Sequence, residues 1–264
     1  MTDVKQVAAD LLAEQDALDE IVAGISEEQW NLPTPAPGWA VRDQIGHLAY
    51  FDGTAAMAIS DPEAFKAAVQ ELMAGGDESV EDRTLYRHLS PSDLLDAWRN
   101  NRRRLAEVSA GLDDGTRVEW YGPSMGAKSF LTARLMEAWA HGQDVADALG
   151  VERPASDRLR HIAQLGVITR GWSYVNRGLT PPEGDVRVEL TAPGGEEWAW
   201  GPEGAADTVR GPAEDFCKVV TQRRHVEDTA LEVEGDLARD WMDKAQAFAG
   251  PATEGPRPRG TGTA

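Results

Sequence analysis

The chain has 264 residues, of which 41% are hydrophobic and 27% charged, and its formal net charge is −19. This composition is typical of globular proteins, and the length exceeds that of one average domain. The excess of acidic residues would repel a phosphate backbone and an anionic membrane surface, so we expect neither nucleic acid nor membrane partners.

Features of export and membrane insertion are missing from the sequence. No hydrophobic stretch approaches the roughly 18 residues that a membrane-spanning helix needs, and the N-terminus lacks the apolar core of a signal peptide. The single cysteine, Cys217, excludes an internal disulfide and a cysteine-rich metal site. These features predict a cytoplasmic protein, in which any metal is bound by histidine and carboxylate side chains.

Hydrophobic residues recur at intervals of three and four through the first 150 positions, as they do on one face of a helix. This pattern predicts long helices over residues 4–25, 41–60, 91–112 and 128–149, and a short one over residues 62–73. The loops between them carry turn signals such as the prolines at 33, 35 and 37. Four long helices joined by loops predict an antiparallel bundle, which we assign to residues 1–152.

The pattern changes after Pro154. Residues 159–175 are expected to form a helix, and residues 186–190 alternate hydrophobic and polar side chains, which is typical of a half-buried strand. Further short strands are indicated near residues 198–200 and 231–233, and helices at residues 212–221 and 237–249. We therefore expect a small α+β domain over residues 153–250, which makes the whole chain α+β, and a disordered tail rich in proline and glycine over residues 251–264.

The helix predicted at residues 128–149 carries a stripe of titratable side chains, namely Arg134, Glu137, His141 and Asp144. Glu137 and His141, four residues apart, project side by side and can chelate one metal ion, as paired ligands do in helical zinc motifs. A third ligand has to come from another helix, and His47 lies in mid-helix among hydrophobic residues, where an unpartnered imidazole is costly. Spacing alone leaves two alternatives open: a core histidine bonded to a carbonyl, and a simple ion pair between Glu137 and His141.

Residues 37–48 read PGWAVRDQIGHL, and residues 137–149 read EAWAHGQDVADAL. These segments resemble the metal-binding motifs of the DinB-like bundle proteins and, more narrowly, of the mycothiol-dependent maleylpyruvate isomerase family of actinobacteria. The resemblance implies a DinB-like four-helix bundle in which His47, Glu137 and His141 bind one divalent ion, usually zinc.

The C-terminal part is similar to the second, sterol-carrier-like domain of the same family. The similarity lies in the helix that begins at residues 211–212 and in the run TQRRH at residues 221–225. The family commonly has a Gly-Arg pair whose arginine reaches toward the active site, whereas this chain has Gln222 before Arg223 and Arg224. We assign the role to Arg223, with an exposed cation at a helix end as the alternative. The other candidates are Arg134 and His225.

Several side chains near the motifs have both a functional and a structural interpretation. Asp144, one turn beyond the histidine of the second motif, either accepts a hydrogen bond from an imidazole or a bound thiol, or is a solvated carboxylate. The same two interpretations apply to Asp43 and Asp52. Trp39 is expected to pack at the start of its helix rather than to touch a ligand, and Cys217 to be a buried packing residue rather than a nucleophile.

Two imidazoles and one carboxylate leave a coordination position open, as in catalytic rather than structural zinc sites. A thiol bound there loses its proton near neutral pH, and the thiolate is the nucleophile. Because the chain offers no suitable cysteine, the thiol would be a small molecule, and the resemblance implies mycothiol. We expect a transferase or isomerase in which the metal activates the thiolate for attack on an electrophilic small molecule, with Arg223 steering an anionic substrate.

Two other functions remain open at this point. The same ion can activate water for the hydrolysis of a small molecule, with Asp144 as the base because Glu137 is occupied as a ligand. The chain can also be a non-catalytic metal- or ligand-binding protein, since a fold does not determine a function. The motifs do not specify the substrate, the choice between monomer and homodimer, or the metal, for which zinc is the default.

Overall fold

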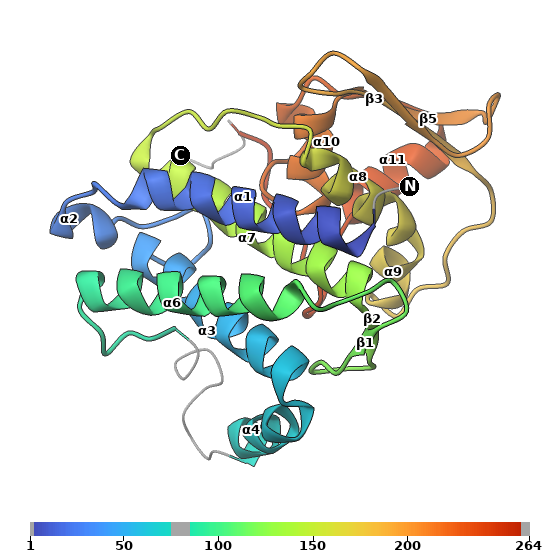
Figure 1. The fold of residues 1–264 in the computed structure, drawn as a ribbon. Coiled ribbons are helices and arrows are strands. Elements are labelled where there is room, and N and C mark those ends of the chain that lie inside the picture. The colour runs from blue at the N-terminus through green and yellow to red at the C-terminus, as the bar shows by residue number, and fades with distance from the viewer. Residues whose placement is uncertain (1–2, 75–84, 260–264) are drawn as a thin grey trace. The chain divides into compact units, whose positions relative to one another are not determined.

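The computed structural model describes residues 3–74 and 85–259, which fall into two compact units divided between Arg153 and Pro154. The first unit is built from helices with a small hairpin, and the second combines helices with a sheet (Figure 1). The prediction of an α+β fold is therefore confirmed. Within the described residues, no helix has both the length and the hydrophobic composition that crossing a membrane requires.

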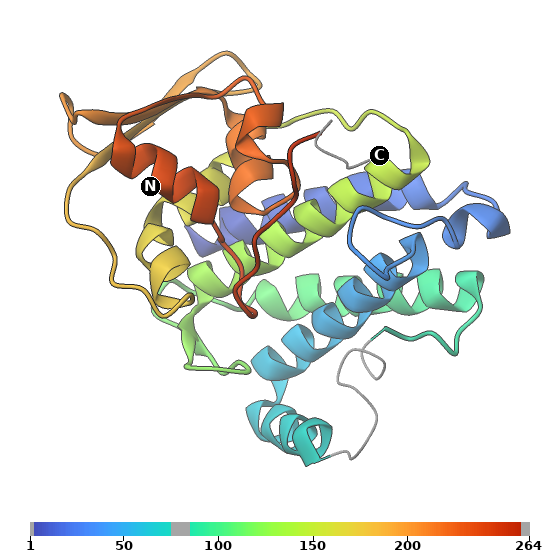
Figure 2. The ribbon, with the colours of Figure 1, turned by 180° about the vertical axis from the view of Figure 1, so that it is seen from behind.

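The long helices of the first unit form a bundle. They are α1 (Val4–Val22), α3 (Val41–Ser60), α6 (Pro91–Ser109) and α7 (Ala127–Leu149), and the shorter elements are α2 (Glu27–Trp30), α4 (Pro62–Ala74) and the paired strands β1 (Arg117–Val118) and β2 (Met125–Gly126). Both α1 and α3 pack against α6 and α7 (Figures 1 and 2). Hydrophobic side chains fill the space between them, among them Leu18, Ile45, Leu48, Trp98 and Val145.

Local sequence signals determine where these helices begin and end. Asp3 and Ser90 cap α1 and α6, since each side chain accepts a hydrogen bond from a backbone N–H of the first turn. Gly150, with a φ of 65°, follows the end of α7 in the left-handed conformation that glycine tolerates. The helix α1 ends at Val22, short of its expected end, and Ser26 then caps the separate helix α2.

Gly46 allows the segment that contains Leu85 to pass closely over α3, directly before the predicted metal ligand His47. A Cβ atom at Gly46 would lie 2.0 Å from the carbonyl oxygen of Leu85, so no other residue fits there without movement of the backbone. The same crossing is held by Arg42, whose Nη2 donates a hydrogen bond to the carbonyl oxygen of Arg87 at 3.0 Å. The crossing therefore fixes the surroundings of the helical turn that carries His47.

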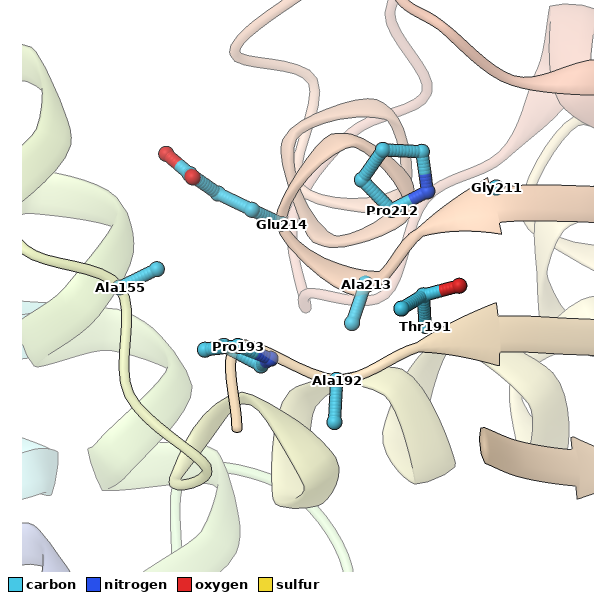
Figure 3. Close-up of a pocket in the computed structure, with 8 residues that line it drawn as sticks. All are labelled: Ala155, Thr191, Ala192, Pro193, Gly211, Pro212, Ala213 and Glu214. Carbon is cyan, nitrogen blue, oxygen red and sulfur yellow. The ribbon is translucent and has the colours of Figure 1, made fainter. Parts of the chain in front are cut away.

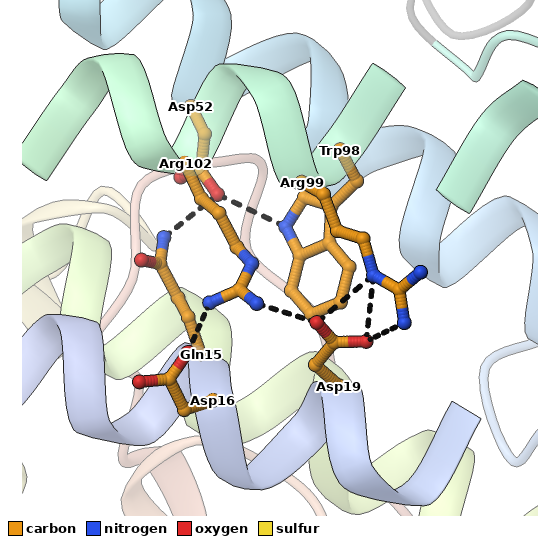
Figure 4. Close-up of polar contacts among 7 residues, drawn as sticks. All are labelled: Gln15, Asp16, Asp19, Asp52, Trp98, Arg99 and Arg102. Atoms are coloured by element: carbon orange, nitrogen blue, oxygen red, sulfur yellow. Dashed lines mark hydrogen bonds and ion pairs between the residues drawn. The ribbon is translucent and has the colours of Figure 1, made fainter. Parts of the chain in front are cut away.

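A buried carboxylate joins the four long helices at the centre of the bundle. Asp52 of α3 has no exposed surface, and its Oδ1 accepts a hydrogen bond from Nη2 of Arg134 on α7 at 2.9 Å. Its Oδ2 accepts hydrogen bonds from Nε2 of Gln15 on α1 at 2.8 Å and from Nε1 of Trp98 on α6 at 3.1 Å (Figure 4). Both oxygens are matched by donors, as a buried charge requires. Asp52 and Arg134 are therefore structural residues of the core.

Nearer the surface, Asp19 of α1 accepts hydrogen bonds from Arg99 and Arg102 of α6 (Figure 4). Burial raises the pKa of the Asp19 carboxyl, but the hydrogen bonds and charges of the two arginines outweigh this effect, and the pKa lies below its ordinary value. Arg102 also pairs with Asp16, whose side chain is 56% exposed. These contacts connect α1 to α6 at the edge of the bundle.

The second unit contains α8 (Leu159–Ile168), α9 (Arg170–Val175), α10 (Ala213–Val220), the 3-10 helix η1 (Val226–Asp228) and α11 (Asp236–Lys244), with strands β3 (Val186–Thr191), β4 (Glu197–Trp200), β5 (Asp207–Pro212) and β6 (Glu232–Glu234). The strands form a sheet in the order β4-β3-β5-β6, in which β3 and β5 are parallel and the outer pairs are antiparallel. The buried side chains of the sheet include Val188, Leu190 and Trp198. They follow the two-residue alternation of their strands.

Two helices of the second unit are shorter than the sequence pattern predicts. The helix expected over residues 159–175 is interrupted at Thr169, whose hydroxyl donates a hydrogen bond back to the preceding turn at 2.7 Å. The last helix ends at Lys244, because the following residues leave the helical conformation and the N–H of Ala247 donates to the carbonyl oxygen of Val220 at 2.8 Å. At Thr169 a local hydrogen bond competes with the helical pattern, and after Lys244 a hydrogen bond to a distant segment does so.

Residues 251–259 of the expected tail form no helix or strand, and residues 260–264 lie outside the described residues. The carbonyl oxygen of Thr253 accepts a hydrogen bond from Nη2 of Arg177 at 2.6 Å. This part of the tail therefore has a polar contact within the second unit.

Removing the central carboxylate of the bundle should destabilise it strongly. The Asp52→Ala variant leaves the guanidinium of Arg134 buried without its partner, which costs about 3–5 kcal/mol. Chemical denaturation followed by circular dichroism measures the loss. The matched control is Asp16→Ala, which removes an exposed ion pair worth about 1 kcal/mol or less. Equal losses in the two variants would contradict the central role of Asp52.

The lowered pKa of Asp19 predicts a dependence of stability on pH. Because the folded state favours the ionised form, this contribution to the free energy of unfolding is complete above the ordinary pKa of about 3.9 and is lost as the pH falls through the folded-state value. We expect Asp19→Asn to be less stable than the wild type at neutral pH, with a difference that shrinks below about pH 3.9. Urea denaturation at a series of pH values measures this difference, and a constant difference would be the contrary result.

Candidate metal centre

The helices α3 and α7 bring the three predicted metal ligands together. Glu137 and His141 lie one turn apart on α7, so their side chains project from the same side of the helix. His47 lies on α3, which packs against α7. Its neighbours Ile45 and Leu48 are fully buried in the bundle core and fix the rotation of α3.

The ligand atoms of the three side chains surround one point. Oε2 of Glu137 lies 3.1 Å from Nε2 of His141 and 3.5 Å from Nε2 of His47, and all three residues offer ligand atoms within 4.8 Å of one another. The side chains of His141, His47 and Glu137 are 11%, 19% and 22% exposed, so the cluster is partly open to solvent. A small molecule can therefore approach it without unfolding of the bundle.

Hydrogen bonding controls the charge of Glu137. Burial raises the pKa of its carboxyl, but the hydrogen bonds with His141 and His47 and the charges of these rings outweigh burial, so the pKa lies well below its ordinary value. Glu137 is therefore a carboxylate at neutral pH. Its charge makes the cluster a favourable place for a cation.

The spacing of the ligand atoms fits a divalent metal. Imidazole nitrogen and carboxylate oxygen ligands lie about 2.0–2.2 Å from zinc, and a tetrahedral arrangement then separates neighbouring ligand atoms by about 3.3–3.6 Å. The two separations from Glu137, 3.1 and 3.5 Å, are close to this range. Two neutral imidazoles and one carboxylate are also the donor types of catalytic zinc sites. The donor types of His47, Glu137 and His141 therefore suit zinc, and both separations measured from Glu137 are close to the tetrahedral range.

Aromatic rings lie on both sides of the cluster. The ring of Trp39 is stacked on that of His141 at a centroid distance of 5.8 Å and lies 5.4 Å from that of His47. On the other side, the ring of Phe51 lies 4.5 Å from that of His47. Trp39 lies at the start of α3, as expected, and its ring also contacts both histidines; the expectation that it does not touch a ligand stays a prediction. Its position directly before the helix, eight residues from His47, was the signal that could have placed it there.

The other residues singled out in the sequence lie elsewhere or serve the fold. Asp144 is only 3% exposed, so its interpretation as a solvated carboxylate is wrong, and its role as a positioning residue stays a prediction. Asp43 caps α3, since its Oδ2 accepts a hydrogen bond from the N–H of Ala40 at 2.9 Å. Arg223 belongs to the second unit, where its Nη1 donates to the carbonyl oxygen of Thr221 at 2.6 Å. Its assignment to substrate binding stays a prediction.

A hollow of about 360 Å³ lies in the second unit where β5 leads into α10 (Figure 3). Its lining is Ala155, Thr191, Ala192, Pro193, Gly211, Pro212, Ala213 and Glu214. These residues are mostly small and apolar, and Glu214 is the only titratable one among them. The lining offers no metal-ligand set, so the chemistry of the protein is better sought at the histidine cluster.

Comparison with known proteins places this cluster in a family. Residues 11–146, more than half of the chain, match the family described as the mycothiol maleylpyruvate isomerase N-terminal domain. The chain belongs to this family. The resemblance found in the two motifs is therefore confirmed, and all three predicted ligands lie inside the matched segment. Residues 182–233 match a second family, described as wyosine base formation.

Similar whole proteins and structures extend the comparison. Two proteins of Mycobacterium tuberculosis, both described as uncharacterized, are 47% identical to this chain over 256 residues, covering 97% of it and 100% of each relative. The crystal structure of the mycothiol-dependent maleylpyruvate isomerase is similar, with a TM-score of 0.54 and 15% identity over 84% of this chain and 92% of that chain. A mutant of that isomerase gives the same TM-score at 14% identity. At this identity the structures show a shared fold.

Metal content provides a direct test of the cluster. We expect the purified wild-type protein to bind one divalent ion per chain, and His47→Ala and His141→Ala to lose stoichiometric binding, because two remaining ligands make a weak site. Inductively coupled plasma mass spectrometry after extensive dialysis measures the occupancy. The matched control is His88→Ala, which removes an exposed histidine of the same unit. Full occupancy in both ligand variants would refute the site.

Proposed function

We propose that this chain is an enzyme that uses a divalent metal and a small thiol, mycothiol, to conjugate or isomerise an electrophilic small molecule. The observation that carries the proposal is the convergence of His47, Glu137 and His141 inside the segment that matches the family. The name of the family includes mycothiol, and the similar solved isomerase is mycothiol-dependent. Zinc is the default metal for this ligand set.

His47, Glu137 and His141 would hold a divalent metal, which would lower the pKa of a thiol bound at the remaining coordination position. As ligands, His47, Glu137 and His141 are not free to accept protons. The thiol proton would therefore pass to water or to another side chain, and the sulfur would add to one carbon of a C=C bond conjugated to a carbonyl, whose π electrons would move to the carbonyl oxygen as an enolate. Isomerisation would result if, after rotation about the former double bond, the enolate re-forms the C=C bond and expels the thiolate. A conjugate would result if the enolate carbon takes up a proton from water instead.

The chain itself cannot supply the nucleophile. Cys217 is its single cysteine, it lies fully buried on α10, and burial raises the pKa of its thiol well above the ordinary value. A thiol in such surroundings is inert, as the sequence predicts for this residue. An external thiol is therefore required, and we expect the reaction to take place in the cytoplasm.

Thiol-dependent turnover tests the proposed function. We expect the zinc-loaded protein to isomerise maleylpyruvate, or to conjugate another unsaturated electrophile, when mycothiol is present. His47→Ala should lower the rate by more than the roughly 100-fold that loss of an outer metal partner costs, because the ligand itself is lost. The measurement combines the loss of free thiol with chromatography of the products. Cys217→Ala is the control for a contribution from the buried cysteine, and it should retain the wild-type rate.

Three results would contradict the proposal in different ways. Hydrolysis of esters or amides without thiol would indicate that the metal activates water. Tight metal binding without turnover of any electrophile in the panel would indicate a binding protein. An equal rate in the wild type and in His47→Ala would separate the reaction from the metal cluster.

A further inference from the structure

A series of hydrogen bonds extends from Nδ1 of His141, the ring nitrogen that does not face Glu137, to the carbonyl oxygen of Trp39. Nδ1 of His141 lies 2.5 Å from Oε1 of Gln44, and Nε2 of Gln44 lies 2.9 Å from Oγ1 of Thr34. The hydroxyl of Thr34 lies 2.9 Å from the carbonyl oxygen of Trp39. Gln44 has no exposed surface, so water does not compete for these contacts.

The direction of every bond in this chain follows from its last member. A carbonyl oxygen can only accept, so the hydroxyl hydrogen of Thr34 goes to Trp39, and Oγ1 of Thr34 is left to accept from the amide of Gln44. The amide therefore turns its nitrogen toward Thr34 and its oxygen toward His141. Since that oxygen also only accepts, Nδ1 of His141 must carry the proton.

The opposite nitrogen of His141 is the one that faces the metal cluster. Nε2 lies 3.1 Å from the carboxylate of Glu137, to which its N–H donates while no cation is bound. Because Gln44 holds the proton on Nδ1, Nε2 is the nitrogen that gives up its proton and offers a lone pair when a cation binds. The other tautomer would place the lone pair of Nδ1 against the oxygen of Gln44 and direct an N–H toward the metal position. The hydrogen-bond chain thus selects the tautomer that can bind a cation.

We infer that Gln44 is a positioning residue that fixes the tautomer and ring orientation of His141 for metal binding, with Thr34 holding the Gln44 amide in place. This inference rests on the proposed metal-dependent function. Gln44 itself touches no metal, thiol or substrate.

The hydrogen-bond series ends in the loop before α3, which is held in place by backbone contacts. The N–H of Thr34 also donates to the carbonyl oxygen of Trp39 at 2.8 Å, and Pro33 pairs with Ala40 in an isolated antiparallel bridge. The carbonyl oxygen that sets the direction of the chain is therefore fixed by the backbone of the loop before α3. The same loop presents the ring of Trp39 to both histidines, so one segment supports the cluster by stacking and by hydrogen bonding.

Zinc affinity distinguishes this role from simple packing. Gln44→Leu keeps the size of the side chain but removes the acceptor, and we expect it to raise the dissociation constant for zinc about 10–100-fold. Gln44→Glu keeps an acceptor for Nδ1–H and should bind zinc at least as tightly as the wild type. Competition with a chromophoric chelator measures the dissociation constants of the full-length proteins.

A second buried glutamine provides the matched control. Gln15 is 1% exposed and donates to Asp52 at 2.8 Å rather than to a histidine. Gln15→Leu should lower the unfolding temperature of the metal-free protein, as Gln44→Leu also should, but leave the zinc dissociation constant unchanged. If both variants lose stability but only Gln44→Leu loses zinc affinity, Gln44 positions His141 rather than merely filling space in the core.

Two further measurements make the inference specific. Thr34→Val should weaken zinc binding less than Gln44→Leu does, and Thr34→Ser, which keeps the hydroxyl, should restore it. Nitrogen-detected NMR of the zinc-loaded protein should reveal a proton on Nδ1 of His141 that exchanges slowly with water in the wild type and in Gln44→Glu, and rapidly in Gln44→Leu.

The possible failures are distinguishable. Wild-type zinc affinity in folded Gln44→Leu, or an equal loss of affinity in Gln44→Glu, would overturn the role of Gln44 and leave the proposed function intact. A wild-type protein that binds no divalent metal would overturn the proposed function and this inference together.

Discussion

An ionised carboxylate that is largely withdrawn from water needs positive charge beside it, and this requirement organises the first unit around Glu137. The carboxylate is held between His141 on its own helix and His47 on α3. The two rings can supply this positive charge in two ways. One ring can be protonated to an imidazolium, or both rings can bind a metal ion together with the carboxylate. The same electrostatic demand that keeps Glu137 ionised therefore favours a cation at the proposed metal site.

The precision of the cluster depends on the register between α3 and α7. That register is set by a second polar contact between the same helices, the buried pair of Asp52 and Arg134. Asp52 follows His47 on α3, and Arg134 precedes Glu137 on α7, so sliding either helix along the other would break both contacts. Asp52 also accepts hydrogen bonds from α1 and α6, which add to the stability of the bundle, while the register between α3 and α7 depends on Arg134. The buried carboxylate of Asp52 thereby helps to keep the carboxylate of Glu137 in position beside His47.

The sequence predicts local features of this arrangement well and distant ones poorly. The long helices and the pairing of Glu137 with His141 follow from spacing along a single helix. His47 was suggested by its position in mid-helix among hydrophobic residues and supported by the resemblance of its motif, since no periodicity relates residues of two separate helices. Gln44 was missed for the same reason: it lies 97 positions from His141, and a glutamine three residues before a histidine has no distinctive pattern. The end of α8 at Thr169 shows how one side-chain hydrogen bond can override helical periodicity.

The distribution of the proposed roles along the chain has a consequence for mechanism. His47, Glu137, His141 and Gln44 all belong to the first unit, whereas Arg223 belongs to the second. Metal affinity is then a property of the bundle, set by its ligands and by the hydrogen bonds behind them. A cation of the second unit that serves the substrate would alter the Michaelis constant without altering zinc affinity. Loss of both together in an Arg223→Ala variant would mean that the second unit also maintains the fold of the metal centre, and that the two roles cannot be assigned to separate units.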